Sequence, residues 1–131
     1  MMNVVLDTNV LISAAWSPNR GASDILHAIF SGKFTVCYDH RILSEYYRVF
    51  RYPKFNFPLW EIKAILDPIV KHGLCVVADP ITNISFERDE TDRKFYEVAK
   101  FCHAVLVSGN LKHYPQDSDI LSIAEFCERY L

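Results

Sequence analysis

Three acidic side chains that lie far apart along the chain, Asp7, Glu45 and Asp92, are of a type that can do chemistry together. Asp7 directly follows residues 4–6, a short apolar run typical of a buried parallel strand. Carboxylate oxygens are preferred ligands of hard divalent cations, and a bound cation relieves the repulsion between neighbouring acids. Because such a cation can activate water and stabilise charge on a phosphate, these acids indicate metal-assisted hydrolysis.

Each acid also has an ordinary structural explanation. An Asp at the end of a strand often closes a turn, and an Asp in a first helical turn, such as Asp92, is favoured by the helix dipole. Glu45 can pair with Arg41 or Arg48 on its own helix face. Taken singly, these explanations are the simpler ones, so the chemical interpretation depends on the three acids meeting at one place.

Strands and helices are predicted to alternate along the chain and to bring these residues together. Strands are predicted at residues 4–6, 34–38, 74–78 and 104–107, with a short fifth at 120–121. Helices are predicted at residues 10–16, 22–30, 39–50, 59–72 and 92–103, and from Ser122 onward. This order predicts an α/β fold with a central parallel sheet of four to five strands and helices on both faces. Ligands of such sheets bind outside the carboxyl ends of the strands, where Asp7 and Asn110 are expected.

Local signals mark the ends of several of these elements. Asp39 is predicted to cap the helix over residues 39–50, and Ser122 with Glu125 forms a capping box. Residues 17–21 are predicted to form a loop. Pro68 predicts a kink or break inside the helix over 59–72.

Basic residues follow the same helix face as Glu45. At 3.6 residues per turn, Arg41 and Arg48 lie beside Glu45, whereas Arg51 is turned away. With Lys54 they can form a strip that contacts phosphates, or simply an ordinary solvated helix face. The aromatic side chains nearby are interpreted as core, not as base-stacking platforms: Tyr46, Tyr47, Phe50 and Phe95.

The composition fits one soluble domain spanning residues 1–131, with half of the residues apolar and 14% aromatic. A net charge of -2 and a pI near 6.2 argue against a general nucleic-acid coat protein, but allow an enzyme with a local basic patch. The four cysteines form no closely spaced pair, so buried thiols in a reducing cytosol are expected. No signal peptide or membrane span is apparent, and a cytoplasmic location is expected.

Four segments together resemble the motifs of PIN-domain nucleases, and the resemblance covers essentially the whole chain. Residues 4–13, VVLDTNVLIS, resemble the opening of that family, most closely its VapC-like toxins of toxin–antitoxin systems. Residues 42–46, 89–95 and 105–111 are similar to its second, third and fourth motifs. The first motif is fairly specific, and the others gain weight from their order and spacing.

The resemblance implies a metal-dependent endoribonuclease. Asp7, Glu45 and Asp92 would bind Mg²⁺ or Mn²⁺, and RNA would be cut to leave a 5′-phosphate and a 3′-hydroxyl. Asn9 and Ser108 would orient the carboxylates or the scissile phosphate. Implied partners are a second copy of the chain, forming a homodimer or higher homo-oligomer, and a cognate antitoxin protein; no membrane is implied.

The fourth motif departs from the family pattern, because many PIN domains have Asp where this chain has Asn110. An amide oxygen can ligate a hard cation but brings no charge, so a second metal position is in doubt. Asp117 or Asp119 just downstream offers a substitute carboxylate. His113 is close in sequence, but loop histidines are more often neither acids nor ligands, and it is not assigned a catalytic role.

Two other classes of protein remain as alternatives. A haloacid dehalogenase-type phosphatase needs a second Asp two residues after the first, and this chain has Asn9 there. A non-catalytic PIN fold that binds RNA or protein is the more serious alternative, and Asn110 favours it. The retention of Asp7, Glu45 and Asp92 argues against it, since a binding module has no need for three repelling acids.

Overall fold

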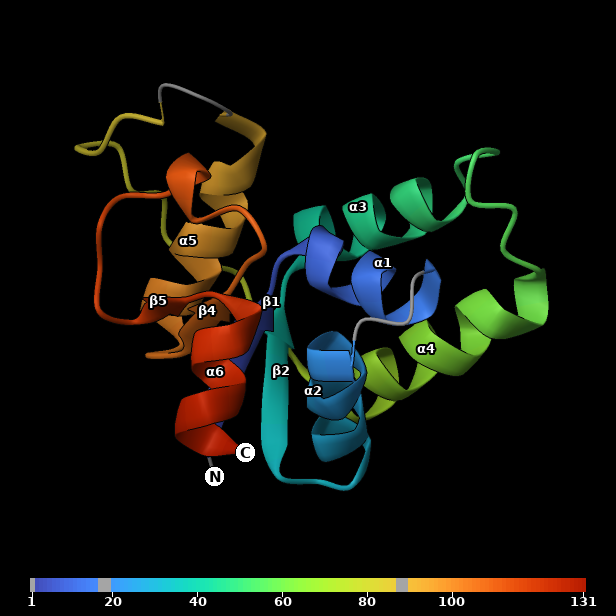
Figure 1. Ribbon diagram of the computed structural model, residues 1–131. Coiled ribbons are helices and arrows are strands. Elements are labelled where there is room, and N and C mark those ends of the chain that lie inside the picture. The colour runs from blue at the N-terminus through green and yellow to red at the C-terminus, as the bar shows by residue number, and fades with distance from the viewer. Residues whose placement is uncertain (1, 17–19, 87–89) are drawn as a thin grey trace.

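A parallel sheet forms the centre of the computed structural model, which describes residues 2–16, 20–86 and 90–131 (Figure 1). Within these residues its five strands are β1 (Met2–Leu6), β2 (Phe34–Tyr38), β3 (Leu74–Cys75), β4 (Val105–Val107) and β5 (Ile120–Leu121). They lie in the order β3-β2-β1-β4-β5, with every pair parallel. In the central strand, Val4 lies opposite both Val36 and Val105. The residue after β1 therefore emerges between the ends of β2 and β4.

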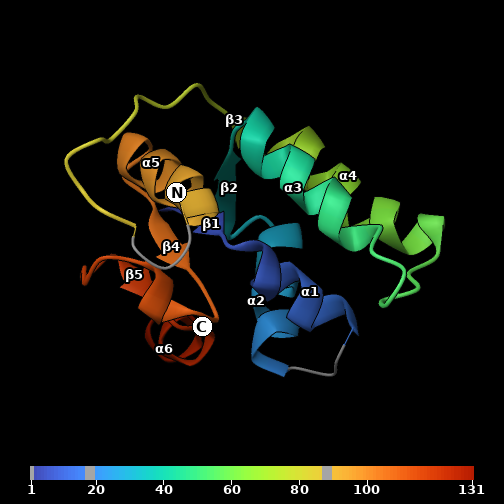
Figure 2. The same ribbon diagram turned by 90° about the horizontal axis from the view of Figure 1, so that it is seen from above.

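Helices cover both faces of this sheet. They are α1 (Thr8–Trp16), α2 (Arg20–Phe30), α3 (His40–Phe50), α4 (Leu59–His72), α5 (Arg93–Phe101) and α6 (Ile123–Tyr130), with 3₁₀ turns η1 (Glu90–Asp92) and η2 (Leu111–His113). Helix α5 packs against β1, β2 and β4, while α2 packs against β2 and α6 against β5. Figure 2 shows α5 on the opposite side of the sheet from α2 and α6. The predicted α/β fold, with a parallel sheet and helices on both faces, is confirmed.

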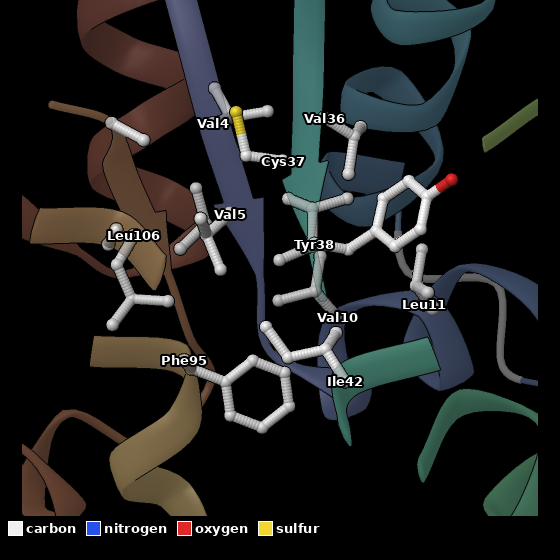
Figure 3. Packing of buried hydrophobic residues seen from close by; sticks show 14 of the residues in the cluster. Val4, Val5, Val10, Leu11, Val36, Cys37, Tyr38, Ile42, Phe95 and Leu106 are labelled. Carbon is white, nitrogen blue, oxygen red and sulfur yellow. The ribbon is translucent and has the colours of Figure 1, made fainter. Parts of the chain in front are cut away.

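The core forms where these layers meet. Val4, Val5 and Leu6 of β1 are fully buried, as expected for a central strand covered on both faces. Figure 3 shows Phe95 of α5 and Ile42 of α3 among the packed side chains beside this strand. Burial of one such side chain stabilises the fold by roughly 1.5–3 kcal/mol. The packed core therefore holds in place the strand ends that carry polar residues.

One buried hydrogen bond fastens α3 to the end of β1. The hydroxyl of Tyr46, itself fully buried, donates to the carbonyl oxygen of Leu6 at 2.5 Å. Tyr46 adjoins Glu45, and Leu6 adjoins Asp7. The bond therefore fixes the two acids relative to each other although they are distant in the sequence.

The predicted helix caps are confirmed. The side chain of Asp39 accepts a hydrogen bond from Ile42 N at 2.9 Å. Ser122 and Glu125 exchange the two reciprocal bonds of a capping box at the start of α6. Each signal is local in sequence, which is why the pattern alone was sufficient.

Some predicted boundaries differ from the structure. Arg20 and Gly21, predicted as loop, form the first turn of α2; Ser17–Asn19 of the same predicted loop lie outside the described residues. The third strand, predicted over 74–78, ends at Cys75. It is an edge strand, and Val77 is 85% exposed, so the apolar run is not buried as the pattern suggested.

Of the kink or break predicted at Pro68, the break does not occur, because α4 continues through it to His72. Proline removes the helix hydrogen bond to the carbonyl of Ala64, and Ala64 is an exposed residue that water can reach. Buried Leu66 and Ile69 on either side of the proline anchor the helix. Tertiary packing therefore outweighs the local effect of the ring.

The helix predicted over residues 92–103 is shorter at both ends. Asp92 belongs to η1, and the α-helix ends at Phe101. His103 has a φ of 51°, in the left-handed region that commonly ends helices. This turn directs the chain into β4.

No helix within the described part of the chain is long and apolar enough to cross a membrane.

Candidate active site at the carboxyl edge of the sheet

Asp7 lies at the carboxyl end of β1 and is held from two sides. Its backbone N–H donates to the carbonyl of Val107 in β4 at 3.0 Å. Its side chain is only 5% exposed, and Oδ2 accepts bonds from the hydroxyls of Ser108 at 2.9 Å and Tyr114 at 2.7 Å. The carboxylate therefore has a fixed orientation before any ligand binds.

Glu45 faces the same region from α3 and is 8% exposed. The hydroxyl of Thr8, the residue after Asp7, donates to its Oε2. Its Oε1 lies 2.8 Å from Nζ of Lys94 and 3.7 Å from a guanidinium nitrogen of Arg48. The predicted pairing with Arg48 exists, but the closer cation comes from α5.

Asp92 is buried, with 7% exposure, at the junction of η1 and α5. Although it stands at the N-cap position, its side chain makes no capping bond to the helix. Instead, Oδ2 lies 2.7 Å from Nδ1 of His113. The helix dipole favours an acid at this position, but the Asp92 carboxylate contacts His113 and does not cap the helix.

The Tyr114 hydroxyl is influenced by the charges of all three acids. Burial raises the pKa of Asp7, the hydrogen bonds from Tyr114 and Ser108 oppose this, and the charge of Glu45 raises it further. Burial also raises the pKa of Tyr114, and the charges of Asp7, Asp92 and Glu45 all add to the effect. The Tyr114 hydroxyl is therefore within electrostatic reach of all three carboxylates.

The loop after β4 is tied to the site by short hydrogen bonds. Oδ1 of Asn9 accepts from Gly109 N at 3.0 Å, and Ser108 Oγ accepts from Asn110 N at 2.9 Å. Asn110 is exposed at the rim of the site. Asp117, considered as a substitute carboxylate, instead forms an ion pair with Lys100.

The arginines predicted to contact RNA separate into two groups. Arg41 binds the buried carboxylates of Asp39 and Glu97, each at 2.7 Å. Arg48, with a 62% exposed side chain, lies beside Glu45 and faces solvent. Together with Arg51 it lines an open hollow of about 600 Å³ on α3, whose other lining residues are His40, Leu43, Ser44 and Tyr47.

The donor chemistry of the site fits a hard divalent cation. The carboxylates of Asp7, Glu45 and Asp92 are oxygen ligands. Burial, and to a smaller extent the charge of Glu45, raises the pKa of Asp7, and a cation would favour its ionised form. As arranged here, Lys94 and His113 engage two of these acids. Among the described residues, no three His, Cys, Asp or Glu side chains are grouped closely enough to hold an ion. Asp89 of the third motif lies outside those residues.

Sequence reasoning missed three contacts of the site. Thr8 and Tyr114 bond directly to the acids, and Lys94 supplies a nearly buried cation. Thr8 adjoins Asp7 and Lys94 lies two residues after Asp92, so proximity to the acids was an available signal. Tyr114 had none, because only the fold brings it to Asp7, 107 residues away.

Comparisons with known proteins relate the chain to a domain family and to a relative. The family model described as PIN domain matches residues 3–112. The chain is also 33% identical over 125 residues to the uncharacterized protein MJ1680 of Methanocaldococcus jannaschii, an alignment that covers 95% of this chain and 76% of the relative. The matched segment includes Asp7, Glu45, Asp92 and Asn110.

Proposed function

Because the chain belongs to the PIN domain family, whose fold is of the nuclease type, we propose that it is a metal-dependent endoribonuclease. The observation that carries the proposal is that Asp7, Glu45 and Asp92 are all buried and that the charges of all three act on one hydroxyl, that of Tyr114. Buried acids with excess negative charge are costly unless a function requires them.

In this proposal each residue of the site has a distinct part. Mg²⁺ or Mn²⁺ held by Asp7, Glu45 and Asp92, with the Asn110 amide at the rim, would supply Lewis-acid activation of water. Ser108 and Tyr114 fix the direction of the Asp7 carboxylate. Thr8 does the same for Glu45, so the orientations of these two carboxylates are set by their neighbours before the substrate binds. Asn9 holds the loop over residues 108–110 through Gly109.

The hollow on α3 gives the substrate a path next to the acids. Arg48 lies between Glu45 and the hollow, and Arg51 is one further turn along the helix. The guanidinium of Arg51 lies 5.9 Å from the ring centroid of Tyr47, which leaves a planar, positively charged surface facing solvent. Guanidinium groups contact phosphates and stack on bases, so single-stranded RNA is the proposed ligand.

The finer assignment is part of the same proposal. We propose that residues 1–131 act as one PIN-like domain, the toxin component of a toxin–antitoxin system in the cytoplasm. Its partners would be a second copy of the chain and a cognate antitoxin protein. The similarity of residues 4–13 to the opening of VapC-like toxins supports this. Growth arrest on expression, relieved by the product of a neighbouring gene, is the expected result; unimpaired growth would contradict the toxin assignment.

A non-catalytic PIN fold that binds RNA or protein is the second candidate. The exposed, uncharged Asn110 favours it, as do the ion pairs that engage Glu45 and Asp92 in the absence of a metal. Under this alternative, RNA would bind to Arg48 and Arg51 but would not be cut.

Cleavage of a mixed RNA pool by purified, antitoxin-free protein separates the two candidates. The wild-type protein should cut with Mn²⁺ and not with EDTA, and Asp92→Asn should not cut. Asp67→Asn, which changes an exposed acid on α4, is the matched control and should cut normally. Binding without cutting by the wild-type protein, across several RNAs and both metals, would support the non-catalytic module instead.

A further inference from the structure

A row of aromatic rings follows the last turn of α3. The rings of Tyr52 and Phe55 are stacked, with centroids 6.4 Å apart and an angle of 9° between their planes. Phe57 continues the row at 5.6 Å from Phe55, and Trp16 at the end of α1 meets Phe55 edge-on at 4.8 Å. We call these four residues the aromatic platform. In Figure 1, residues 52–57 follow the end of α3 that is farther from α5.

Two rings of the platform reach the solvent. Trp16 is 58% exposed and Tyr52 is 39% exposed, whereas Phe55 and Phe57 are partly buried against the core. Exposed rings that gather at one place mark interaction sites on soluble proteins, because each offers a large, flat apolar surface. The inner rings therefore support the outer two, on which a flat group can stack.

The charge around the platform indicates which kind of partner it takes. Residues 46–60 contain no acid and three cations, Arg48, Arg51 and Lys54. Within the described residues neither Arg51 nor Lys54 forms an ion pair with an acid, and Nζ of Lys54 lies 5.1 Å from the ring centroid of Phe55. Positive charge interleaved with exposed rings complements a single strand of nucleic acid, which presents phosphates together with unstacked bases.

The hollow on α3 connects the platform to the candidate active site. Arg48 and Arg51 line this hollow, and a guanidinium nitrogen of Arg48 lies 3.7 Å from Oε1 of Glu45. Tyr52 directly follows Arg51, which places it roughly 10 Å from Glu45 along the axis of α3 at 1.5 Å per residue. A strand that crosses the hollow would therefore reach the platform within a few nucleotides of the acids.

We propose that the aromatic platform is a base-stacking subsite for single-stranded RNA, in which bases stack on Tyr52 and Trp16 while Arg51 and Lys54 contact phosphates. The inference rests on the proposed function, because the strand that it holds is the proposed substrate. Bases in a duplex are already stacked on one another, so the platform selects unpaired segments. It selects them without reading their sequence, because every base has a flat face.

Binding of a short, unstructured, labelled RNA in EDTA tests the subsite without cleavage. Tyr52→Ala and Trp16→Ala should each weaken binding about tenfold, because one stacked base loses its support, and Tyr52→Phe should bind like the wild type. Phe101→Ala, which removes a 45% exposed ring on α5, is the matched control and should bind normally. Equal affinity of the wild type and both alanine variants would overturn the proposal.

Salt dependence separates stacking from charge. Lys54→Met should lower the slope of log affinity against log salt by about 0.7, the value for one phosphate contact on a single strand. Tyr52→Ala should leave this slope unchanged, and it should bind an RNA backbone without bases as well as the wild type does. Weaker binding of the base-free backbone by Tyr52→Ala would mean that the ring only supports the cations, and the stacking role would be lost.

The fluorescence of Trp16 gives a direct reading with the platform intact. The chain has two tryptophans, so Trp60→Phe leaves Trp16 as the only one. Single-stranded RNA in EDTA should quench its emission, and a duplex of the same sequence should quench it less. Emission that ignores RNA but changes with protein concentration would identify the platform as an interface between two copies of the chain, against the proposal.

Cleavage assays distinguish this inference from the proposed function. Tyr52→Ala should raise KM for RNA about tenfold with kcat little changed, since stacking away from the scissile bond acts equally on the ground state and the transition state. Platform-dependent binding by a wild-type protein that does not cut would count against the nuclease alone. Cutting with an unchanged KM in both alanine variants would leave the nuclease standing and overturn the platform.

Discussion

The structure contains a second cluster of buried acids, and it differs from the candidate active site in how its charge is compensated. Asp39 and Glu97 are as well buried as Asp7, with 6% and 3% exposure. Arg41 bridges them, and the backbone N–H groups of Ile42 and Ile81 donate to their remaining oxygens at 2.9 Å and 2.8 Å. We call this the closed cluster, because Arg41 bonds both carboxylates and one backbone N–H group bonds each of them.

In the candidate active site one buried acid, Asp7, has no cationic partner among the described residues. Asp7 is bonded only by neutral hydroxyl and backbone groups, and its pKa is raised by burial and by the charge of Glu45. Lys94 is the only lysine or arginine in the described residues whose side chain pairs with a site acid at 2.8 Å or less. The comparison shows that burial of an acid is not by itself a functional signal, since uncompensated charge is what separates the two clusters.

The largest predicted effect is a loss of RNA cleavage on substitution of an acid in the candidate active site but not in the closed cluster. Asp92→Asn is expected to lower kcat/KM for RNA cleavage by at least about 100-fold, or about 2.7 kcal/mol, because a charged ligand is lost. Glu97→Gln, equally buried but in the closed cluster, should keep the activity of whatever fraction remains folded. Steady-state cleavage normalised to folded protein measures both. Equal losses of activity would remove the distinction between the clusters.

The second effect should distinguish them by stability. Arg41→Met leaves Asp39 and Glu97 without their shared cation and should lower the free energy of unfolding by about 2–3 kcal/mol. Arg48→Met at the active site should change it by less than about 0.5 kcal/mol, because that pair is exposed and long. Urea denaturation of the four proteins, including Arg41→Lys, gives these values. A similar small loss for both methionine variants would mean that the closed cluster does not stabilise the fold.

Much of the fold was predictable because its signals are local. The apolar runs of β1, β2 and β4, the cap at Asp39 and the capping box at Ser122 each depend on a few adjacent residues. Pro68 and the end of β3 were not predictable in the same way. Both are decided by what packs against them, which the pattern does not contain.

The same distinction between local sequence signals and contacts made only by the fold applies to the site. The acids Asp7, Glu45 and Asp92 were identified from strand ends, helix faces and the family motifs, and the structure places all three in buried positions. Two of their expected neighbours, Ser108 and Arg48, are in contact with them, whereas Tyr114 was not identified because only the fold brings it to Asp7. Arg41 illustrates the limit: helix spacing places it beside Glu45, yet its charge is taken by Glu97, 56 residues away.

The smallest predicted effect is a change in melting temperature on substitution of Asp7, and its direction tests whether the charge of Asp7 is uncompensated. Burial and the charge of Glu45 raise the pKa of Asp7 above 3.8, so the folded protein keeps this proton to a higher pH than the unfolded chain does. Ionised Asp7 therefore destabilises the metal-free fold above its folded pKa, and this penalty vanishes below 3.8, where both states are protonated. Asp7→Asn should accordingly raise the melting temperature at pH 7 in EDTA, by an amount worth about 1 kcal/mol.

The advantage of Asp7→Asn should shrink as the pH falls through the folded pKa of Asp7, which melting curves from pH 7 to pH 4 would follow. Glu97→Gln should show the opposite sign at pH 7, since Arg41 loses one of the two carboxylates that it bridges. Addition of Mn²⁺ should reverse the order of wild type and Asp7→Asn, because the ion stabilises only the form with the carboxylate. A destabilised Asp7→Asn in EDTA at pH 7 would mean that hydrogen bonds from Ser108 and Tyr114 outweigh the burial of the charge. The site would then be a closed cluster like that of Arg41, and uncompensated charge would no longer mark it as functional.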